Sequence, residues 1–251
     1  LSSVASVKVP AGASEVVFEN LSPYFNGNSL QVKIKGDARL NTAVFQLKTP
    51  GPAPENPRAQ VLRDSLVILG DDFSSEQWGT GSDADSSVEY AGDALNFFIT
   101  RDLYFVWSTP NAETYQNVHI EVTANNNSTD STGAFGIICN MQVTDVSYYF
   151  AITGAGQYAI GKSAVAQDDV FLTNNDTWET SSAITSGASS YRIGADCGSN
   201  GTLTLYVDGQ QIDSVVDTTY TNGNVALFGW SGEQASGTNV SFDDFQMTEL
   251  P

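Results

Sequence analysis

Three adjacent pairs of aspartates are the acidic groups in this sequence that could do chemistry: Asp71-Asp72, Asp168-Asp169 and Asp243-Asp244. Hydrolysis of a glycosidic bond needs two carboxyl groups about 5 to 9.5 Å apart, one as the acid and one as the nucleophile or base. Adjacent residues on a strand point to opposite faces, so none of these pairs forms such a dyad alone. We therefore expect no catalytic residues.

Calcium is the one cofactor that these carboxylates could bind, because it is held by several carboxylate and carbonyl oxygens at once. If the first and last strands of the chain pair, Asp71 or Asp72 could meet Asp243 or Asp244. The alternative, which we favour, is that the four side chains cap strand ends and keep the protein soluble. No compact Asp-x-Asp-x-Asp-Gly loop supports the calcium site.

The histidine and cysteine content limits other chemistry. His119 is the only histidine, so a multi-histidine metal site is excluded, and we expect a half-exposed strand residue. Cys139 and Cys197 are 58 positions apart, which excludes a Cys-x-x-Cys motif. They form either a disulfide that ties neighbouring strands or two small core residues. We favour the disulfide, because the rest of the chain resembles a secreted protein.

Aromatic side chains could bind a sugar, because ring faces stack on the C–H faces of pyranoses. The tryptophans are Trp78, Trp107, Trp178 and Trp230, and most are expected in the core. Trp178 lies in a polar loop and Trp230 follows a strand end at Gly229, so these two are the predicted ligand contacts.

The elements that must position these residues are predicted to be strands from Gly70 onward. Runs rich in β-branched and aromatic residues alternate with turn residues at the spacing typical of sandwiches and barrels. A meander is expected at Phe135–Met141, Ser147–Thr153 and Gln157–Lys162, with Ile137, Cys139 and Met141 on the apolar face. Asp208-Gly209 predicts a type I′ hairpin.

The first 69 residues predict a different organisation. Residues 1–48 contain four short alternating runs that predict a small β domain. Residues 49–69 predict a Pro-rich linker followed by one short helix over Arg58–Leu69, although Val67-Ile68-Leu69 equally suits a strand. The large domain then covers 70–251.

Charge divides the chain in the same place. Residues 1–65 carry seven basic and five acidic residues, whereas residues 66–251 carry three basic and 24 acidic ones, a net charge of −21. Such an acidic body repels phosphate backbones, so nucleic acid is a poor partner. No apolar run is long enough to span a membrane, and the start at Leu1 rather than Met suggests a mature or trimmed product.

Three segments of the large domain resemble a concanavalin A-like, laminin G-type jelly roll: DDFSSEQWGTG, NGTLTLYVDGQQID and NVSFDDFQMTEL. The resemblance covers roughly 70–251 and implies an antiparallel jelly-roll β-sandwich whose first and last strands lie side by side. It also implies a binding module more often than a glycosidase. Catalytic members usually carry Glu-x-Asp-x-x-Glu on one strand, and this sequence has no such motif.

The segment VKVPAGASEVVFENLSPYFNGNSLQVKIKGDARL resembles the short N-terminal β domain of mucoidy-inhibitor-like surface proteins. In that family a long coiled coil follows, and here only the short predicted helix stands in its place.

These observations favour a non-catalytic extracellular or cell-surface module, secreted and disulfide-bonded, that binds a polysaccharide or a cell-surface glycan. The alternative is a structural subunit of an extracellular filament or surface layer, self-associating into a polymer through its N-terminal strands. A glycoside hydrolase with carboxylates in its loops is the third hypothesis. We expect the partner to meet loops, acidic faces or the N-terminal strands.

Overall fold

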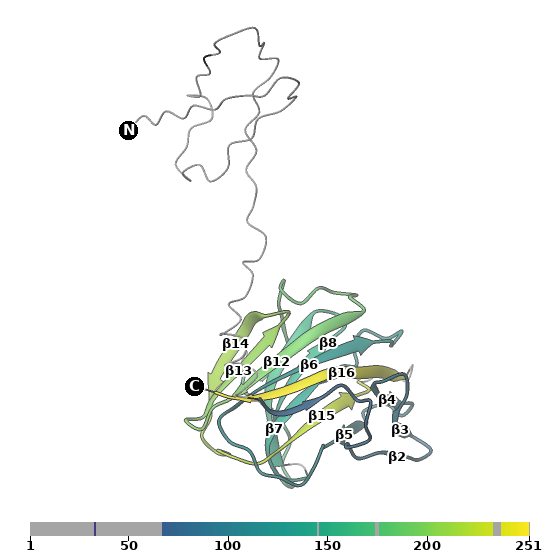
Figure 1. Ribbon diagram of the computed structural model, residues 1–251, viewed down its shortest axis with the longest axis horizontal. Helices are drawn as coiled ribbons and strands as arrows, with labels where there is room; N and C mark the ends of the chain where they lie inside the picture. Colours follow the sequence, from purple (N-terminus) through teal and green to yellow (C-terminus); the bar gives the residue numbers. More distant parts are fainter. Residues whose placement is uncertain (1–32, 34–66, 145, 174–175, 233–236, 251) are drawn as a thin grey trace. The chain divides into compact units, whose positions relative to one another are not determined.

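Short alternating runs of β-branched and aromatic residues form the strands of a two-layered jelly-roll sandwich (Figure 1). The computed structural model describes residues 33, 67–144, 146–173, 176–232 and 237–250. The chain divides into two units, Leu1–Pro54 and Glu55–Pro251, and the described strands all belong to the second. Apart from residue 33, the predicted β domain at 1–48 lies outside the described residues, and so does the linker up to residue 66. No helix among the described residues could span a membrane.

One layer is a nine-stranded sheet in the order β14-β13-β12-β6-β16-β4-β3-β2, with β1 also paired to β16. Its strands are β1 (Val67–Asp71), β2 (Gly81–Ser82), β3 (Ser86–Tyr90), β4 (Leu95–Ile99), β6 (Val118–Asn126), β12 (Ser190–Cys197), β13 (Thr202–Val207), β14 (Gln210–Val216) and β16 (Thr238–Glu249). The first and last strands lie antiparallel side by side, as the sequence predicted, with Val67 opposite Thr248.

The second layer is a seven-stranded sheet in the order β10-β9-β8-β7-β15-β5, with β11 also paired to β9. Its strands are β5 (Phe105–Ser108), β7 (Ala134–Val143), β8 (Val146–Thr153), β9 (Gln157–Ser163), β10 (Val170–Phe171), β11 (Glu179–Thr180) and β15 (Asn224–Trp230). The predicted meander is β7-β8-β9, so it forms the middle of this sheet.

The core lies between the two sheets and is filled by the inward side of each strand. Phe135 of β7 and Tyr191 of β12 meet across it, with ring centroids 6.0 Å apart. Phe97 and Phe242 pack edge to face within the nine-stranded sheet. Apolar and polar residues alternate along the strands because every second side chain faces the opposite sheet.

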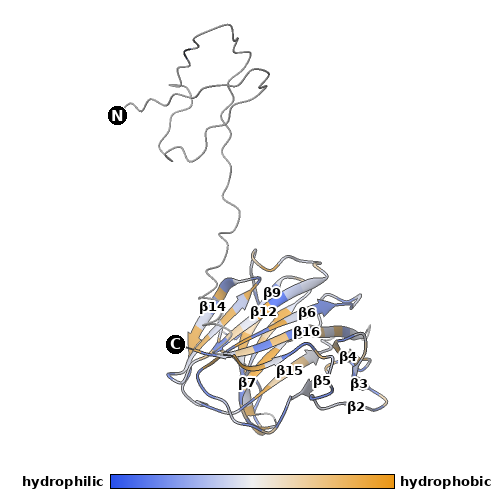
Figure 2. Ribbon diagram, in the orientation of Figure 1, coloured by the Kyte–Doolittle hydropathy of each residue, from blue (hydrophilic) through white to orange (hydrophobic). Residues whose placement is uncertain are grey.

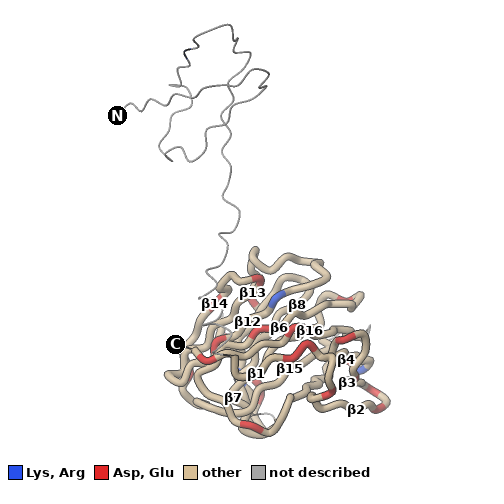
Figure 3. The backbone as a smooth tube through the Cα atoms, viewed as in Figure 1, with Lys and Arg blue, Asp and Glu red and all other residues tan. Residues whose placement is uncertain are grey.

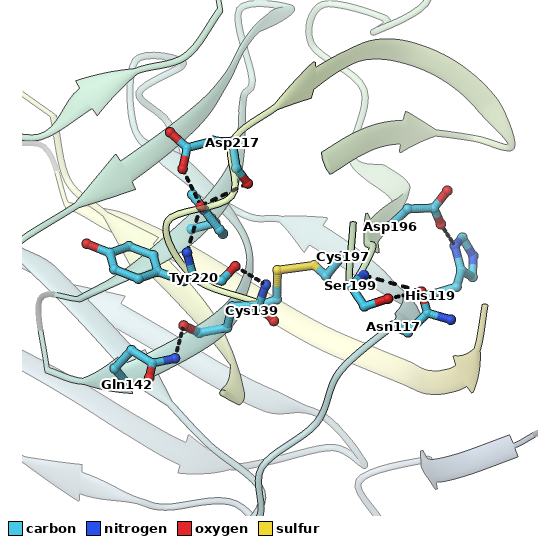
Figure 4. The surroundings of a disulfide bond; sticks show 11 residues. Asn117, His119, Cys139, Gln142, Asp196, Cys197, Ser199, Asp217 and Tyr220 are labelled. Atoms are coloured by element: carbon cyan, nitrogen blue, oxygen red, sulfur yellow. Dashed lines mark hydrogen bonds and ion pairs between the residues drawn. A yellow bond between two sulfur atoms is a disulfide. The ribbon is translucent and has the colours of Figure 1, made fainter. Parts of the chain in front are cut away.

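The disulfide between Cys139 and Cys197 is present and crosses this core (Figure 4). Cys139 belongs to β7 and Cys197 to β12, so the bond joins the two sheets. The prediction of the bond is confirmed, but the prediction that it ties neighbouring strands is wrong. Alternating patterns identify the inward residues of each strand and do not say which sheet a strand joins.

Two other local predictions are corrected. Val67–Leu69, the end of the predicted helix, is strand β1, and residues 58–66 lie outside the described part of the chain. Met141 packs on the outer side of its sheet and not in the core with Ile137 and Cys139. A bulge causes this, since Asn140 has a φ of 51° and the pairing with β15 shifts register there. The type I′ hairpin is confirmed, with positive φ at both Asp208 and Gly209.

Candidate functional site

The outer side of the seven-stranded sheet carries a second apolar cluster, separate from the core. Its buried members are Ala134, Ile138, Tyr149, Ala151, Ala226 and Phe228. Hydrophobic residues along β7 and β15 are visible in Figure 2. We name its seven large rings the outer aromatic face: Phe105, Trp107, Tyr149, Phe171, Trp178, Phe228 and Trp230. An outer sheet face is normally polar, so this one calls for an explanation.

Six of these rings form a continuous series of contacts. Phe105 stacks on Phe228 with centroids 5.0 Å apart, and Tyr149 meets both Phe228 and Phe171 edge to face. Phe171 in turn contacts Trp178 at 5.0 Å, and Trp178 lies nearly parallel to Trp230 at 6.4 Å. Trp230 and Phe105 are paired residues of β15 and β5, so the two ends of the series lie on neighbouring strands.

The two predicted tryptophans therefore come together, although 52 positions separate them. Trp178 lies just before β11 and Trp230 ends β15. Their rings are tilted by only 23° and their centroids are 6.4 Å apart, within the range of offset-stacked aromatic pairs. Each tryptophan is only partly buried, which leaves ring surface for a ligand.

Glycines on the same sheet face make room for two of the buried rings. A Cβ atom on Gly161 would lie 2.1 Å from Tyr149 Cζ, so the tyrosine ring lies directly over this glycine. A Cβ on Gly136 would lie 3.3 Å from a ring carbon of Phe228 and 1.9 Å from the Phe150 carbonyl oxygen. These two close approaches hold the rings flat against the backbone.

Acidic groups border the outer aromatic face but do not enter it. Burial raises the pKa of Tyr149 far above its usual value, and a hydrogen bond with the Asp169 carboxylate raises it further. Asp176 accepts a hydrogen bond from the Phe171 amide at 2.7 Å. Strands β5, β7, β8, β9 and β15 contain no Asp or Glu at all. The middle of the surface thus offers rings and backbone, with Asp169 and Asp176 at the side near Tyr149.

The remaining members of this surface were not singled out from the sequence. Phe105 and Trp107 alternate along β5, and Phe228 and Trp230 alternate along β15. Aromatic residues at a period of two in both strands were the available signal. A second apolar face on those strands could have been inferred from it.

The predicted calcium ligands have structural roles in the structure. Asp71 is buried, and its carboxylate accepts hydrogen bonds from the Phe73 amide at 2.8 Å and from Trp78 Nε1 at 3.0 Å. Asp72 accepts from the amide and the hydroxyl of Ser74. Both carboxylates stabilise the turn that follows β1.

Asp243 and Asp244 lie at the bulge in β16. The Asp243 carboxylate accepts from the Asp244 amide, and the Asp244 carbonyl accepts from the Arg192 guanidinium at 2.6 Å. A shallow depression of about 470 Å³ contains Asp71, Asp72 and Asp244 together with Arg192. Across the described residues, no three His, Cys, Asp or Glu side chains gather as a metal site. Calcium binding stays a prediction.

His119 lies on β6, and its side chain is on the outer side of the nine-stranded sheet. Along the strands of the sandwich, Asp and Glu outnumber Lys and Arg (Figure 3). The His119 side chain is 28% exposed, as expected of a half-exposed strand residue. Nδ1 lies 2.6 Å from Asp196 Oδ1 and Nε2 lies 3.5 Å from Glu121 Oε1. Burial lowers the pKa of His119, but the hydrogen bonds to Asp196 and Glu121 outweigh it and raise the pKa to about 9. The imidazolium is thus a structural cation.

The first residues of the chain match a known family. Residues 1–77 match the family described as an N-terminal domain of unknown function (DUF4140), which covers under one third of the chain. The match leaves the resemblance to mucoidy-inhibitor-like proteins untested. No curated protein is significantly similar to this chain.

Solved structures that resemble the chain are jelly-roll domains. The carbohydrate-binding module CBM66 from Bacillus subtilis has a TM-score of 0.55 at 9% identity, covering 70% of this chain and 98% of its own. A Bacillus subtilis protein of unknown function with a galectin-like fold has a TM-score of 0.55 at 10% identity, covering 73% and 96%. A β-glucanase from Bacillus licheniformis has a TM-score of 0.50 at 13% identity, covering 72% and 97%. At these identities the likeness shows the fold alone.

Proposed function

We propose that this chain is a non-catalytic, secreted carbohydrate-binding module whose ligand surface is the outer aromatic face. The observation that carries the proposal is the near-parallel pair Trp178 and Trp230, partly exposed at the margin of a buried aromatic cluster. Rigid rings bind the C–H faces of sugars at a small cost in side-chain entropy, because the cluster already holds them in place.

The fold supports the same function without specifying it. A carbohydrate-binding module and a β-glucanase share this architecture, so the fold admits both binding and hydrolysis. Composition of the sheet favours binding, because β5, β7, β8, β9, β10 and β15 supply no carboxylate to act as acid or nucleophile, and Glu179 of β11 is paired with the core residue Tyr158. The disulfide supports a secreted protein, since such bonds persist in oxidising compartments.

Binding is tested with a panel of soluble polysaccharides: mixed-linkage β-glucan, xylan, mannan, levan and polygalacturonate. Affinity electrophoresis identifies a retarding polysaccharide, and isothermal titration measures its Kd. We expect Trp178→Ala and Trp230→Ala each to weaken binding about tenfold or more, which corresponds to about 1.4 kcal/mol.

Phe98→Ala is the matched control, because Phe98 is 45% exposed and lies on β4 of the opposite sheet. Its affinity should equal that of the unmodified protein. Unchanged Kd values in both tryptophan variants, or no retardation by any polysaccharide, would refute the proposed site. Release of reducing ends from a bound polysaccharide would instead show a hydrolase. Self-association through the N-terminal strands concerns residues outside the described part and stays a prediction.

A further inference from the structure

We propose that the outer aromatic face continues into a groove beside β5, so that the site takes an internal stretch of an extended, uncharged polysaccharide. This inference rests on the proposed function and specifies its ligand. It predicts that the site binds several consecutive sugar units. A site at Trp178 and Trp230 alone would need only the terminal units of a polysaccharide.

The groove lies where the edge of the seven-stranded sheet faces the edge of the nine-stranded sheet. Its volume is about 380 Å³, and its lining includes Thr80, Gly81 and Ser82 on one side and Val106 and Trp107 on the other. The lining is mixed, with hydroxyl groups, backbone, apolar side chains and one carboxylate, Asp83. This composition suits a polyhydroxylated ligand that also presents C–H faces.

Trp107 joins the two regions. It packs against the outer aromatic cluster and also lines the groove. It stands opposite Phe228 in the β5–β15 pairing. A ligand lying on Phe105, which is 40% exposed, therefore reaches Trp107 on the same strand without leaving an aromatic surface.

The groove wall is held in place by hydrogen bonds to β5. Gly79 donates its amide to the Thr109 carbonyl at 3.1 Å, and Ser108 Oγ donates to the Gly79 carbonyl at 2.7 Å. These bonds fix the segment that leads into β2 beside the edge strand. The groove is thus formed before any ligand arrives, which lowers the entropy cost of binding.

The length of the surface indicates an extended ligand. The partly exposed rings extend from Phe171, which contacts Tyr149 of β8, to Trp107 on β5. Strands β8 and β5 are three strand spacings apart, about 14 Å, and the groove extends further beyond β5. Trp178 adds ring surface at the other end through its contact with Phe171. A single sugar ring covers only a fraction of this distance.

Charge at the two ends indicates an uncharged ligand. Asp169 and Asp176 border the face near Tyr149, and Asp83 lines the groove. Residues 66–251 carry a net charge of −21, so the surrounding field repels uronic acids and sulfated sugars. Trp107, Phe105 and Phe228 offer no charge for an ionic group to pair with.

Two variants change the groove without touching Trp178 or Trp230. Gly81 has open space around its Cβ position, so Gly81→Gln adds a side chain at the groove with no steric conflict. Trp107→Ala removes the connecting ring. Gly70→Gln is the matched control, because Gly70 is exposed on β1, does not line the groove, and its added Cβ meets only ordinary contacts at 3.8 and 3.9 Å. Circular dichroism and thermal melts establish that each variant is folded.

The experiment titrates oligosaccharides of increasing length, prepared from the panel polysaccharide that binds most tightly, into the unmodified protein and these variants. We expect affinity to rise with each added unit over the first several. Gly81→Gln should weaken the longest oligosaccharide about tenfold and leave the disaccharide unchanged. Trp107→Ala should weaken the longest oligosaccharide about tenfold and the disaccharide less, while Trp178→Ala weakens both. Gly70→Gln should alter neither.

A disaccharide that binds as tightly as the longest oligosaccharide would overturn the inference while leaving the proposed function intact, provided that Trp178→Ala still weakens it. The same conclusion holds if Gly81→Gln and Trp107→Ala both keep full affinity for the longest oligosaccharide. Tighter binding of polygalacturonate than of every uncharged polysaccharide would refute the assigned charge class. If no polysaccharide binds, the proposed function fails and this inference fails with it.

Discussion

Breaking the disulfide should destabilise the sandwich domain strongly, because the bond restricts its unfolded chain. Cys139 and Cys197 are 58 residues apart in sequence. In the chain-entropy treatment, closing a loop of this length stabilises the folded state by about 4 kcal/mol at 25 °C. A domain of this size has a free energy of unfolding of roughly 5–15 kcal/mol, so the loss is a large share of the total.

The assay is urea unfolding of oxidised protein, reduced protein and the Cys139→Ala/Cys197→Ala variant, followed by tryptophan fluorescence. With an m-value of about 2 kcal/mol per molar urea, the midpoint should fall by about 2 M on reduction. The m-value itself should increase, because an unfolded chain without the cross-link exposes more surface. Reductant should leave the double variant unaffected, which controls for effects of the reagent.

The single variants test whether the cross-link itself, and not sulfur packing, carries the stabilisation. Cys139→Ala and Cys197→Ala each break the same bond, so each should lose nearly as much as the double variant, and the losses should not add. Additive losses, or a decrease on reduction below about 1 kcal/mol, would refute the loop-closure reasoning.

Three further outcomes are expected. Because the pKa of His119 is raised to about 9, its stabilising contribution is complete below pH 6.5 and is lost as the pH rises through 9. In urea titrations, His119→Gln should reduce the loss of unfolding free energy between pH 6.5 and 9.5 by about 1–2 kcal/mol, allowing for solvent screening. Burial of Asp217 raises its pKa, but hydrogen bonds from Lys162, Thr219 and Tyr148 lower the pKa well below its usual range. The stabilising contribution of Asp217 is therefore present at neutral pH and lost on acidification. Asp217→Asn should lower the urea midpoint at pH 7 and make the midpoint less sensitive to acid. Gly136→Ala should destabilise by about 1–3 kcal/mol or more in thermal melts, because the new Cβ would lie 1.9 Å from the Phe150 carbonyl oxygen.

Local features of the fold could be predicted from the sequence because they depend on neighbouring residues. Asp208 and Gly209 tolerate the positive φ angles of a tight hairpin, and both adopt them. The alternation in 135–141 predicted Ile137 and Cys139 as inward residues, and they are buried in the core. Met141 does not follow this pattern, because the bulge at Asn140 inserts one residue and reverses the side on which the following side chains lie.

The candidate site could not be predicted as a whole, because its residues are distant in sequence and meet only in the folded sheet. Trp178 and Trp230 were identified singly, because one lies in a polar loop and the other after a strand. Their stacking depends on the order of β9, β8, β7 and β15 in one sheet, which the sequence pattern does not specify. We expected the partner to meet loops, acidic faces or the N-terminal strands. The proposed site instead combines one such loop with the strands β5 and β15.

The antiparallel pairing of β1 with β16 has a mechanical consequence. Val67 lies opposite Thr248, so the two ends of the described domain leave from neighbouring points of one sheet. A load applied between those ends would open the pairs one at a time, beginning with Val67 and Thr248, rather than all together. Since β16 also pairs with β6 and β4, β1 would detach first and leave the rest of the sandwich folded. The turn around Asp71 and Trp78 would then be the first structure to resist the force.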